Sequence, residues 1–150
     1  APVAFHTHMP YATALAMIDA EPLCEAGQTA ARFHGRVAVD ADYNGLALDG
    51  SEGARIAGAI GDADIVFMRH HGVMVLGKSI AEAWDDLYYL ERACEVQVLA
   101  MSTGKPLLPI DHELARKTGA QIMSEAAEGA KLHLASIQRQ LDRDEPDYRS

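Results

Sequence analysis

Two groups of histidines have the residue types and spacing that could bind a metal ion, His6-Thr7-His8 and His70-His71-Gly72. On a β-strand, residues i and i+2 point to the same side with their Cα atoms about 6.6 Å apart, so His6 and His8 can direct both imidazoles to one ion. Imidazole nitrogens bind zinc at about 2.0–2.1 Å. The spacing is compatible with a chelate, although a pair of this kind alone is more often two ordinary surface or hydrogen-bonded histidines.

A third nitrogen from a remote strand end would complete a catalytic type of metal site. Three protein ligands leave coordination positions for water or a reactant, whereas a structural zinc site has four closed ligands. The histidine doublet can supply the third ligand, but strand alternation places His70 and His71 on opposite faces, so only one of them can join the site. Alternation alone does not decide which. Each cluster precedes a residue that bends the chain, Pro10 or Gly72, as is common for sites at strand ends.

The other histidines and the cysteines are interpreted as structural. The remaining histidines have no companion at ligand spacing, which favours solvated or internally satisfied rings for His34, His112 and His133. Cys24 and Cys94 lie far apart and form no CxxC pattern. They are expected to be small buried hydrophobic residues in a reducing compartment rather than a disulfide.

A pair of carboxylates has two interpretations. The segment from Ile80 to Ser102 is apolar nearly all round, which predicts a helix packed on more than one neighbour. Glu91 and Glu95 fall within its apolar sector. They could form an acid/base pair, but we favour structural pairing with a group such as Arg92 or a neighbouring subunit, because buried ion pairs also occupy such positions.

Strand and helix signals alternate along the chain and must position these groups. Apolar runs predict strands over residues 3–8, 37–39, 65–68 and 73–76. The pattern also predicts helices that start at Pro10, Ser51, Ser79 and Asp111 and run to about Asp19, Ile60, Ser102 and Leu141. Residues 20–36 are predicted to be mostly loop, residues 42–45 a turn and residues 142–150 a frayed tail.

Several helix boundaries have a local physical reason. Proline suits the first helical position because its missing N–H would be unpaired there. Ser79-Ile80-Ala81-Glu82 is a capping box, in which the serine accepts from the N3 amide and the glutamate returns to the N-cap amide. Gly61 is expected to end the second helix, and Gly104 with Pro106 the third.

Composition restricts the class of protein. The chain has 150 residues, 49% of them hydrophobic and 23% charged, which predicts one globular domain over residues 1–150. A formal charge of −9 argues against nucleic acid and anionic membranes as partners. The sequence has no apolar run of about 20 residues and no signal-peptide pattern, so we expect a cytoplasmic protein. Because the strand pattern begins at Ala1 without a Met, we expect either a fragment or a truncated gene product.

Three separated motifs together resemble the class II aldolase/adducin family. They are His6–Ala16, Met68–Gly77 and the helix from Ser79 to Ala100, in the family's order, and the resemblance covers residues 1 to about 107. It implies an α/β fold, an α/β/α sandwich on a mainly antiparallel central sheet, and a homotetramer with active sites between subunits. By position it makes His6, His8 and His71 the metal ligands, for Zn²⁺ or less often Mn²⁺ or Co²⁺, and leaves His70 beside the site.

The resemblance also implies a function. It predicts a metal-dependent lyase that acts on a small oxo- or hydroxy-acid or sugar derivative through a metal-bound enediolate. Within the family a decarboxylase or an epimerase is equally compatible. The alternative is a protein of another functional class, a non-catalytic adducin-like assembly module. The intact set of three histidines argues against this alternative.

Parts of the family pattern have no counterpart here. The Gly-Asn phosphate loop, the first strands and a glutamate that lie upstream in family enzymes would precede Ala1. No residue of this chain is identified as the general base. Tyr11 and Tyr43 are the candidates for the tyrosine that some aldolases borrow from a neighbouring subunit.

Overall fold

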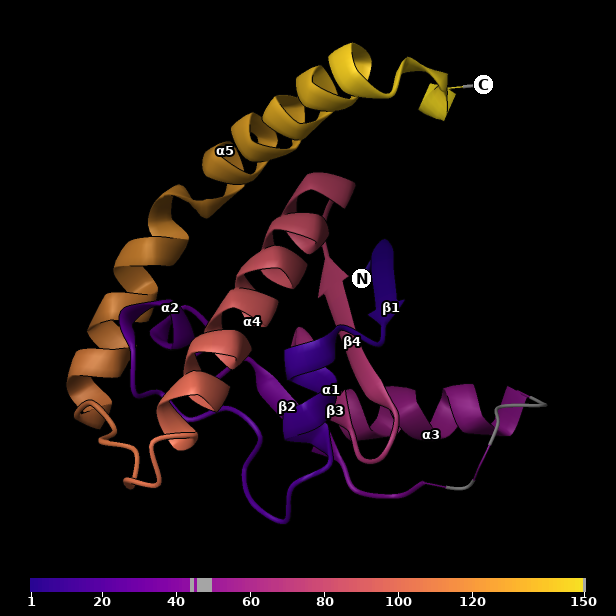
Figure 1. Ribbon diagram of the computed structural model, residues 1–150. Coiled ribbons are helices and arrows are strands. Elements are labelled where there is room, and N and C mark those ends of the chain that lie inside the picture. Colours follow the sequence, from indigo (N-terminus) through magenta and orange to yellow (C-terminus); the bar gives the residue numbers. More distant parts are fainter. Residues whose placement is uncertain (44, 46–49, 150) are drawn as a thin grey trace.

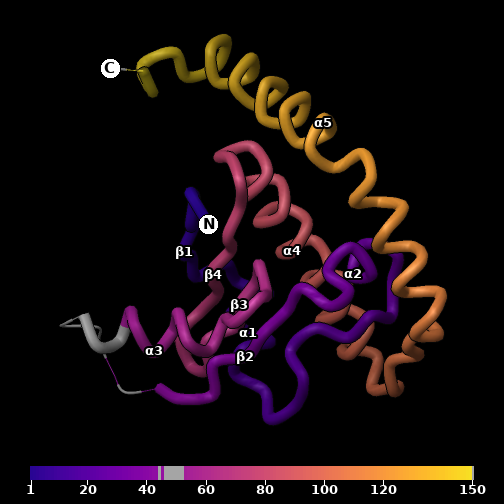
Figure 2. Tube along the Cα trace, turned by 180° about the vertical axis from the view of Figure 1, so that it is seen from behind, coloured from indigo at the N-terminus to yellow at the C-terminus, as the bar shows by residue number. Residues whose placement is uncertain are grey.

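The computed structural model describes residues 1–43, 45 and 50–149, the side chains of residues 50–52 excepted (Figures 1 and 2). Its strands are Val3–Thr7 (β1), Val37–Asp40 (β2), Ile65–Met68 (β3) and Gly72–Gly77 (β4). Its helices are Pro10–Ala16 (α1), Gln28–Ala31 (α2), Gly50–Ile60 (α3), Ile80–Met101 (α4) and His112–Asp144 (α5), followed by a 3₁₀ helix, Pro146–Arg149 (η1).

The strands form one mixed sheet in the order β1-β4-β3-β2. β1 with β4 and β4 with β3 are antiparallel, whereas β3 with β2 is parallel. A parallel pair needs a crossover connection, and α3 lies in that connection. The predicted α/β class on a mainly antiparallel sheet is confirmed, with the parallel β2–β3 pair as the exception.

Helices cover both faces of the sheet. On one face the alternate residues of β3 and β4 pack with α1, α4 and the segment after α2, in a core that includes Leu15, Phe33, Phe67, Val73 and Leu90. On the other face Val66 and Met68 pack with Ile56 and Ile60 of α3. The two cores make the α/β/α sandwich. α5 runs along α4 on the outside of the first layer, and its last turns extend past it (Figure 1).

Residues 20–36 are mostly loop, as predicted, apart from one short helix. α2 is a helix of four residues, and Ala30 and Ala31 are buried. A helix this short spans little more than one turn, so it has no measurable 3.6-residue period. α1 is also shorter than predicted, since it ends at Ala16 rather than Asp19.

The predicted caps are mostly present. Ser79 Oγ accepts from the Glu82 amide at 3.2 Å, but the Glu82 carboxylate accepts from the Ser79 hydroxyl rather than returning to its amide. Asp111 caps α5, which ends at Asp144 rather than Leu141. Gly61 ends α3 with a φ of 53°. The predicted cap at Ser51 and the Asn44 position of the predicted turn lie outside the described residues.

No helix in the described part of the chain combines the length and the apolar character that crossing a bilayer requires.

Candidate metal centre

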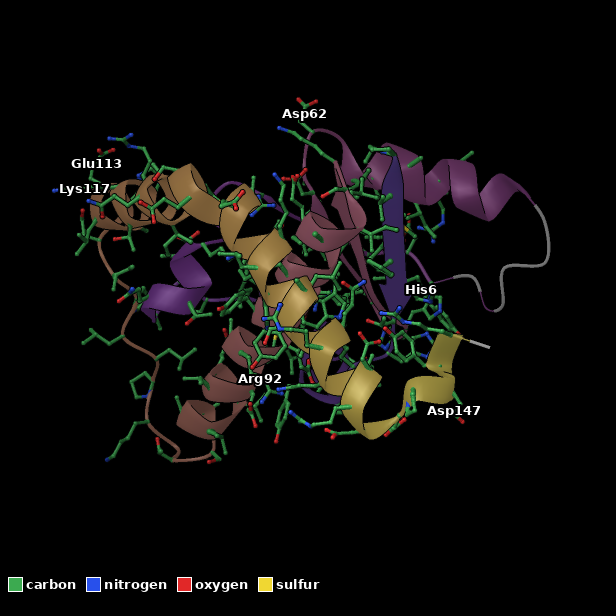
Figure 3. The ribbon with its side chains drawn as sticks, turned by 90° about the horizontal axis from the view of Figure 1, so that it is seen from above. His6, Asp62, Arg92, Glu113, Lys117 and Asp147 are labelled. Atoms are coloured by element: carbon green, nitrogen blue, oxygen red, sulfur yellow. The ribbon has the colours of Figure 1, made fainter. Side chains whose placement is uncertain are left out.

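Three histidine rings from two separate segments meet at one edge of the sheet. His6 lies on β1, where Figure 3 labels it, His8 follows the strand, and His71 lies just before β4. The ring centroids are 4.9 Å apart for His6 and His8, 4.7 Å for His6 and His71, and 4.9 Å for His8 and His71. One nitrogen of each ring lies within 4.8 Å of those of the other two. The structure therefore brings together the three residues that the family resemblance implies as ligands.

The cluster is open to solvent on the side of β1. His6 and His8 are exposed, and His71 is half-buried. This arrangement follows from the alternation of β1, in which Phe5 and Thr7 lie on the face covered by α1 and α4, and His6 lies on the opposite face. A small molecule can therefore reach the three rings from outside.

A hydrogen bond determines which nitrogen of His6 is available. Its Nδ1 lies 3.1 Å from the carbonyl oxygen of Val73. A carbonyl oxygen only accepts, so the neutral ring carries its proton on Nδ1. The lone pair is then on Nε2, which is free of that proton for a ligand.

The turn between β3 and β4 decides between the two histidines of the doublet. The His71 amide donates to the Met68 carbonyl at 3.1 Å, which closes a β-turn with His70 at its third position. His70 has a φ of 58°, the left-handed conformation that this position of a type II turn requires. Its ring contacts Tyr43, with centroids 6.1 Å apart, and His71 alone of the two joins the cluster.

Gly72 lets the two histidine segments approach each other. A Cβ atom at this position would lie 2.5 Å from the Thr7 carbonyl oxygen and 2.7 Å from Cδ2 of His8. Both distances are far below van der Waals contact. The glycine of the His-His-Gly motif is therefore required by the space between the two segments.

The other three histidines are solvated or internally satisfied, as predicted, and two of them also pack on each other. His34 and His112 pack ring against ring at 4.8 Å, and His34 Nδ1 lies 2.8 Å from a Glu25 oxygen. His133 Nδ1 lies 2.7 Å from Asp85. Helix packing brings these partners together from distant parts of the sequence, which spacing along the chain cannot reveal. None of these three rings belongs to the cluster of His6, His8 and His71.

The two carboxylates of α4 have separate structural partners. Glu95 forms an ion pair with Arg92 at 2.6 Å, as predicted. Glu91 is buried and accepts instead from two backbone amides at the start of α1, Tyr11 at 3.0 Å and Ala12 at 2.9 Å. The structural interpretation favoured from the sequence is therefore correct, but the partner of Glu91 is a helix terminus and not an arginine.

Both cysteines are free thiols and are chemically protected. Burial, together with the charge of Glu91, raises the pKa of Cys94 far above its usual value. Burial and the neighbouring Glu25 also raise the pKa of Cys24. A thiol that keeps its proton is a poor nucleophile, so neither cysteine is suited to covalent catalysis.

Sequence reasoning missed a buried ionic network between α2, α4 and α5. Arg32 contacts Asp85 at 2.5 Å and Asp86 at 2.8 Å, and Arg36 contacts Asp86 at 2.5 Å. His133 joins through Asp85. A signal that could have found it was the aspartate doublet within a largely apolar helix. Arg32, Arg36 and Asp86 line a cleft of about 460 Å³, and no member of the histidine cluster lies in its walls. These three charged groups are paired with one another.

Tyr43 is the candidate tyrosine that lies near the cluster. Its ring centroid is 6.3 Å from that of His71, and its side chain is exposed. Tyr11, the other candidate, is partly buried against the main core.

Comparison with known proteins gives consistent matches. Residues 1–98 match the family described as Class II Aldolase and Adducin N-terminal domain. A Pseudomonas aeruginosa protein whose name assigns it to the class 2 aldolases is 36% identical over 111 residues, which is 71% of this chain and 43% of that protein. Decarboxylase NovR of Streptomyces niveus is 34% identical over 79% of this chain and 43% of its own length. The chain spans less than half the length of these curated relatives.

Solved structures share the fold. The crystal structure of an aldolase II superfamily protein from Pseudomonas syringae superposes with a TM-score of 0.87 at 32% identity, over 98% of this chain and 59% of that one. L-fuculose 1-phosphate aldolase from Glaciozyma antarctica superposes with a TM-score of 0.78 at 24% identity, over 94% of this chain and 53% of that one.

Proposed function

The chain belongs to the class II aldolase and adducin family, and on this premise we propose that it carries the metal centre of a lyase that acts on a small oxo- or hydroxy-acid or sugar derivative. The observation that supports the proposal most directly is the convergence of His6, His8 and His71, whose nitrogens lie within 4.8 Å of one another. The ligands would be these three imidazoles, and the ion Zn²⁺, Mn²⁺ or Co²⁺.

The donor set fits such an ion. A tetrahedral ion with bonds of about 2.1 Å separates its ligands by about 3.4 Å, so small side-chain rotations would close the present spacing. The Val73 carbonyl keeps the proton of His6 on Nδ1 and leaves Nε2 to bind an ion. In metal-binding histidines the ring nitrogen that does not bind the metal normally donates a hydrogen bond in this way. Three neutral nitrogens favour a borderline-soft divalent cation over Mg²⁺ or Ca²⁺, which prefer oxygen ligands.

A bound divalent cation would supply Lewis acidity toward the oxygen atoms of a carbonyl or carboxylate. The chain's own residues do the rest of the positioning. His6 and His8 line the side open to solvent, so a reactant can approach from there. The exposed ring of Tyr43 stands beside His71 and offers a phenol and an aromatic face to one flank of a reactant.

The names of relatives support cleavage of a carbon–carbon bond without fixing the substrate. NovR is named a decarboxylase, and the Pseudomonas aeruginosa relative is named for the class 2 aldolases. Both reactions break such a bond and leave negative charge to be stabilised on oxygen. An adducin-related protein of Schizosaccharomyces pombe is 28% identical over 97% of this chain, so an assembly role without catalysis is the competing function.

We also propose that the protein works as a homotetramer in the cytoplasm. Exposed apolar side chains on α4 support assembly, since Val96 and Leu99 are 63% and 57% exposed. Free thiols are typical of a reducing compartment.

Metal analysis of the purified chain tests the metal centre. We expect about one divalent ion per chain, lost in His8→Ala and retained in the control His112→Ala, which removes an exposed histidine from another site. A chain that binds no ion from solutions of Zn²⁺, Mn²⁺ or Co²⁺ would favour the assembly function. Equal metal content in the wild type and His8→Ala would contradict the assigned ligands.

A further inference from the structure

One short helix, α1, lies between the two segments that carry the histidine cluster. α1 has seven residues and begins at Pro10, two residues after His8. The chain just beyond its other end contacts the turn that holds His71. We propose that α1 is a strut that sets the distance between these segments, and that Glu91 and Arg69 are the positioning residues that fix its two ends. This inference rests on the proposed metal centre.

Glu91 fixes the beginning of the strut. Pro10 has no N–H, and the Thr13 amide already donates to the Met9 carbonyl at 2.9 Å. The two amides between them, those of Tyr11 and Ala12, donate to the two oxygens of the Glu91 carboxylate. A single buried carboxylate therefore satisfies the free amides of the first turn and stabilises the positive end of the helix dipole. Because α4 holds Glu91, it also fixes the segment that leaves His8.

Arg69 fixes the far end. Its Nη1 donates to the Ile18 carbonyl and its Nη2 to the Ala20 carbonyl, the second at 2.7 Å. Its own amide donates to the Asp40 carbonyl at 2.9 Å, at the end of β2. Arg69 lies two residues before His71 in the turn. The guanidinium therefore joins the turn of the third histidine to the chain that follows α1.

The strut cannot easily tilt between these two attachments. Ala12, Leu15 and Ala16 are at most 1% exposed, and they pack in the main core with Val73 and Val75 of β4. A tightly packed interior resists a change of helix orientation. Both positioning residues bind backbone atoms. Removing either one therefore changes the path of the chain that carries the histidines without replacing any of the three histidines.

Co²⁺ binding to the chain tests the proposal. The variants are Arg69→Met and Glu91→Gln, and the matched controls are Arg92→Met and Glu95→Gln, which form a more exposed ion pair on the same helix. We expect both test variants to bind Co²⁺ at least about 10-fold more weakly and to change its visible absorption bands, since partners of this kind change affinity by about 10–100-fold. The controls should stay within about twofold of the wild type.

A conservative variant separates positioning from loss of folding. Arg69→Lys can still donate to one of the two carbonyls and should recover part of the affinity lost in Arg69→Met. Native-like circular dichroism with Co²⁺ affinity and bands unchanged in both test variants would overturn the strut. If Arg69→Met does not fold, the His8 and His71 ring signals of Arg69→Lys are compared with those of the wild type, as described next.

A second measurement keeps the strut testable without the metal. In the metal-free chain, ¹H–¹⁵N signals of the His8 and His71 rings should shift in Arg69→Met, or in Arg69→Lys if the former does not fold, and stay in place in Arg92→Met. A wild-type chain that takes up no Co²⁺ contradicts the proposed metal centre, whereas unshifted ring signals in the Arg69 variant contradict the strut.

Discussion

Replacing Gly72 with alanine adds one methyl group where β4 passes the end of β1. The new carbon would start 2.5 Å from the Thr7 carbonyl oxygen and 2.7 Å from Cδ2 of His8. Ordinary contacts lie at about 3.5 Å, so the two segments must separate by about 1 Å. Metal–ligand distances tolerate only about 0.2 Å of error. A shift of this size therefore moves His8 away from His6 and His71 and adds to the rotation that its ring already needs in order to bind a shared ion.

The expected result has two parts. The metal-free Gly72→Ala chain should unfold with a free energy about 1–3 kcal/mol lower than the wild type, the usual cost of overpacking. Its Zn²⁺ affinity should fall by at least about 10-fold, as expected when a ligand's support is lost. Urea unfolding in chelator measures the first quantity, and competition with a chromophoric chelator measures the second.

Gly129 supplies the control. It lies in α5, and a Cβ atom there would have no neighbour within 4 Å. Gly129→Ala should leave the Zn²⁺ affinity unchanged and raise stability by about 0.5–1 kcal/mol, because alanine favours a helix over glycine. Wild-type Zn²⁺ affinity in Gly72→Ala would refute the reasoning, since it would mean that the close approach of β4 does not hold His8.

Three further results are expected. His70→Val should lower the unfolding free energy by about 1–2 kcal/mol relative to His70→Asn in thermal melts, because the left-handed backbone tolerates asparagine; equal melting would contradict this. Burial and Glu91 raise the pKa of the Cys94 thiol, so the unfolded chain releases this proton first and stability should fall above about pH 8.5. Urea unfolding at pH 8 and pH 10 should show a smaller loss in Cys94→Ala, and an identical loss would argue against it. Asp86→Ala removes the carboxylate that Arg32 and Arg36 share and leaves each arginine one other carboxylate, so it should cost about 1–3 kcal/mol in urea unfolding. Asp144→Ala, at an exposed pair, should leave stability nearly unchanged, and similar losses for both variants would count against the buried network.

The parts of the site that the sequence predicted are those with a local signal. His6 and His8 stand at the two-residue spacing of a strand, and Ser79 with Glu82 stands at the spacing of a helix cap. Such patterns depend on neighbours along the chain, so they are visible without coordinates. The choice of His71 over His70 needed the family resemblance, because the turn geometry that separates the two rings leaves no periodic pattern.

The parts that sequence reasoning missed depend on distant partners. Glu91 caps α1 across 79 and 80 residues, and Arg69 reaches carbonyls 49 and 51 residues earlier. Backbone amides and carbonyls are the same in every residue, so no side-chain pattern marks them as partners. The short α2 was missed for a similar reason, since it is held by packing and by Arg32 rather than by its own periodicity.

The cap on α1 also has a consequence for the order of events during synthesis. The ribosome makes His6 and His8 first, yet the carboxylate that secures the helix behind them is made some 80 residues later. Contacts this remote in sequence form slowly, because a long loop must close before they give any stability. The two proposed ligands that are made before His71 are therefore expected to reach their final positions only after α4 has been made.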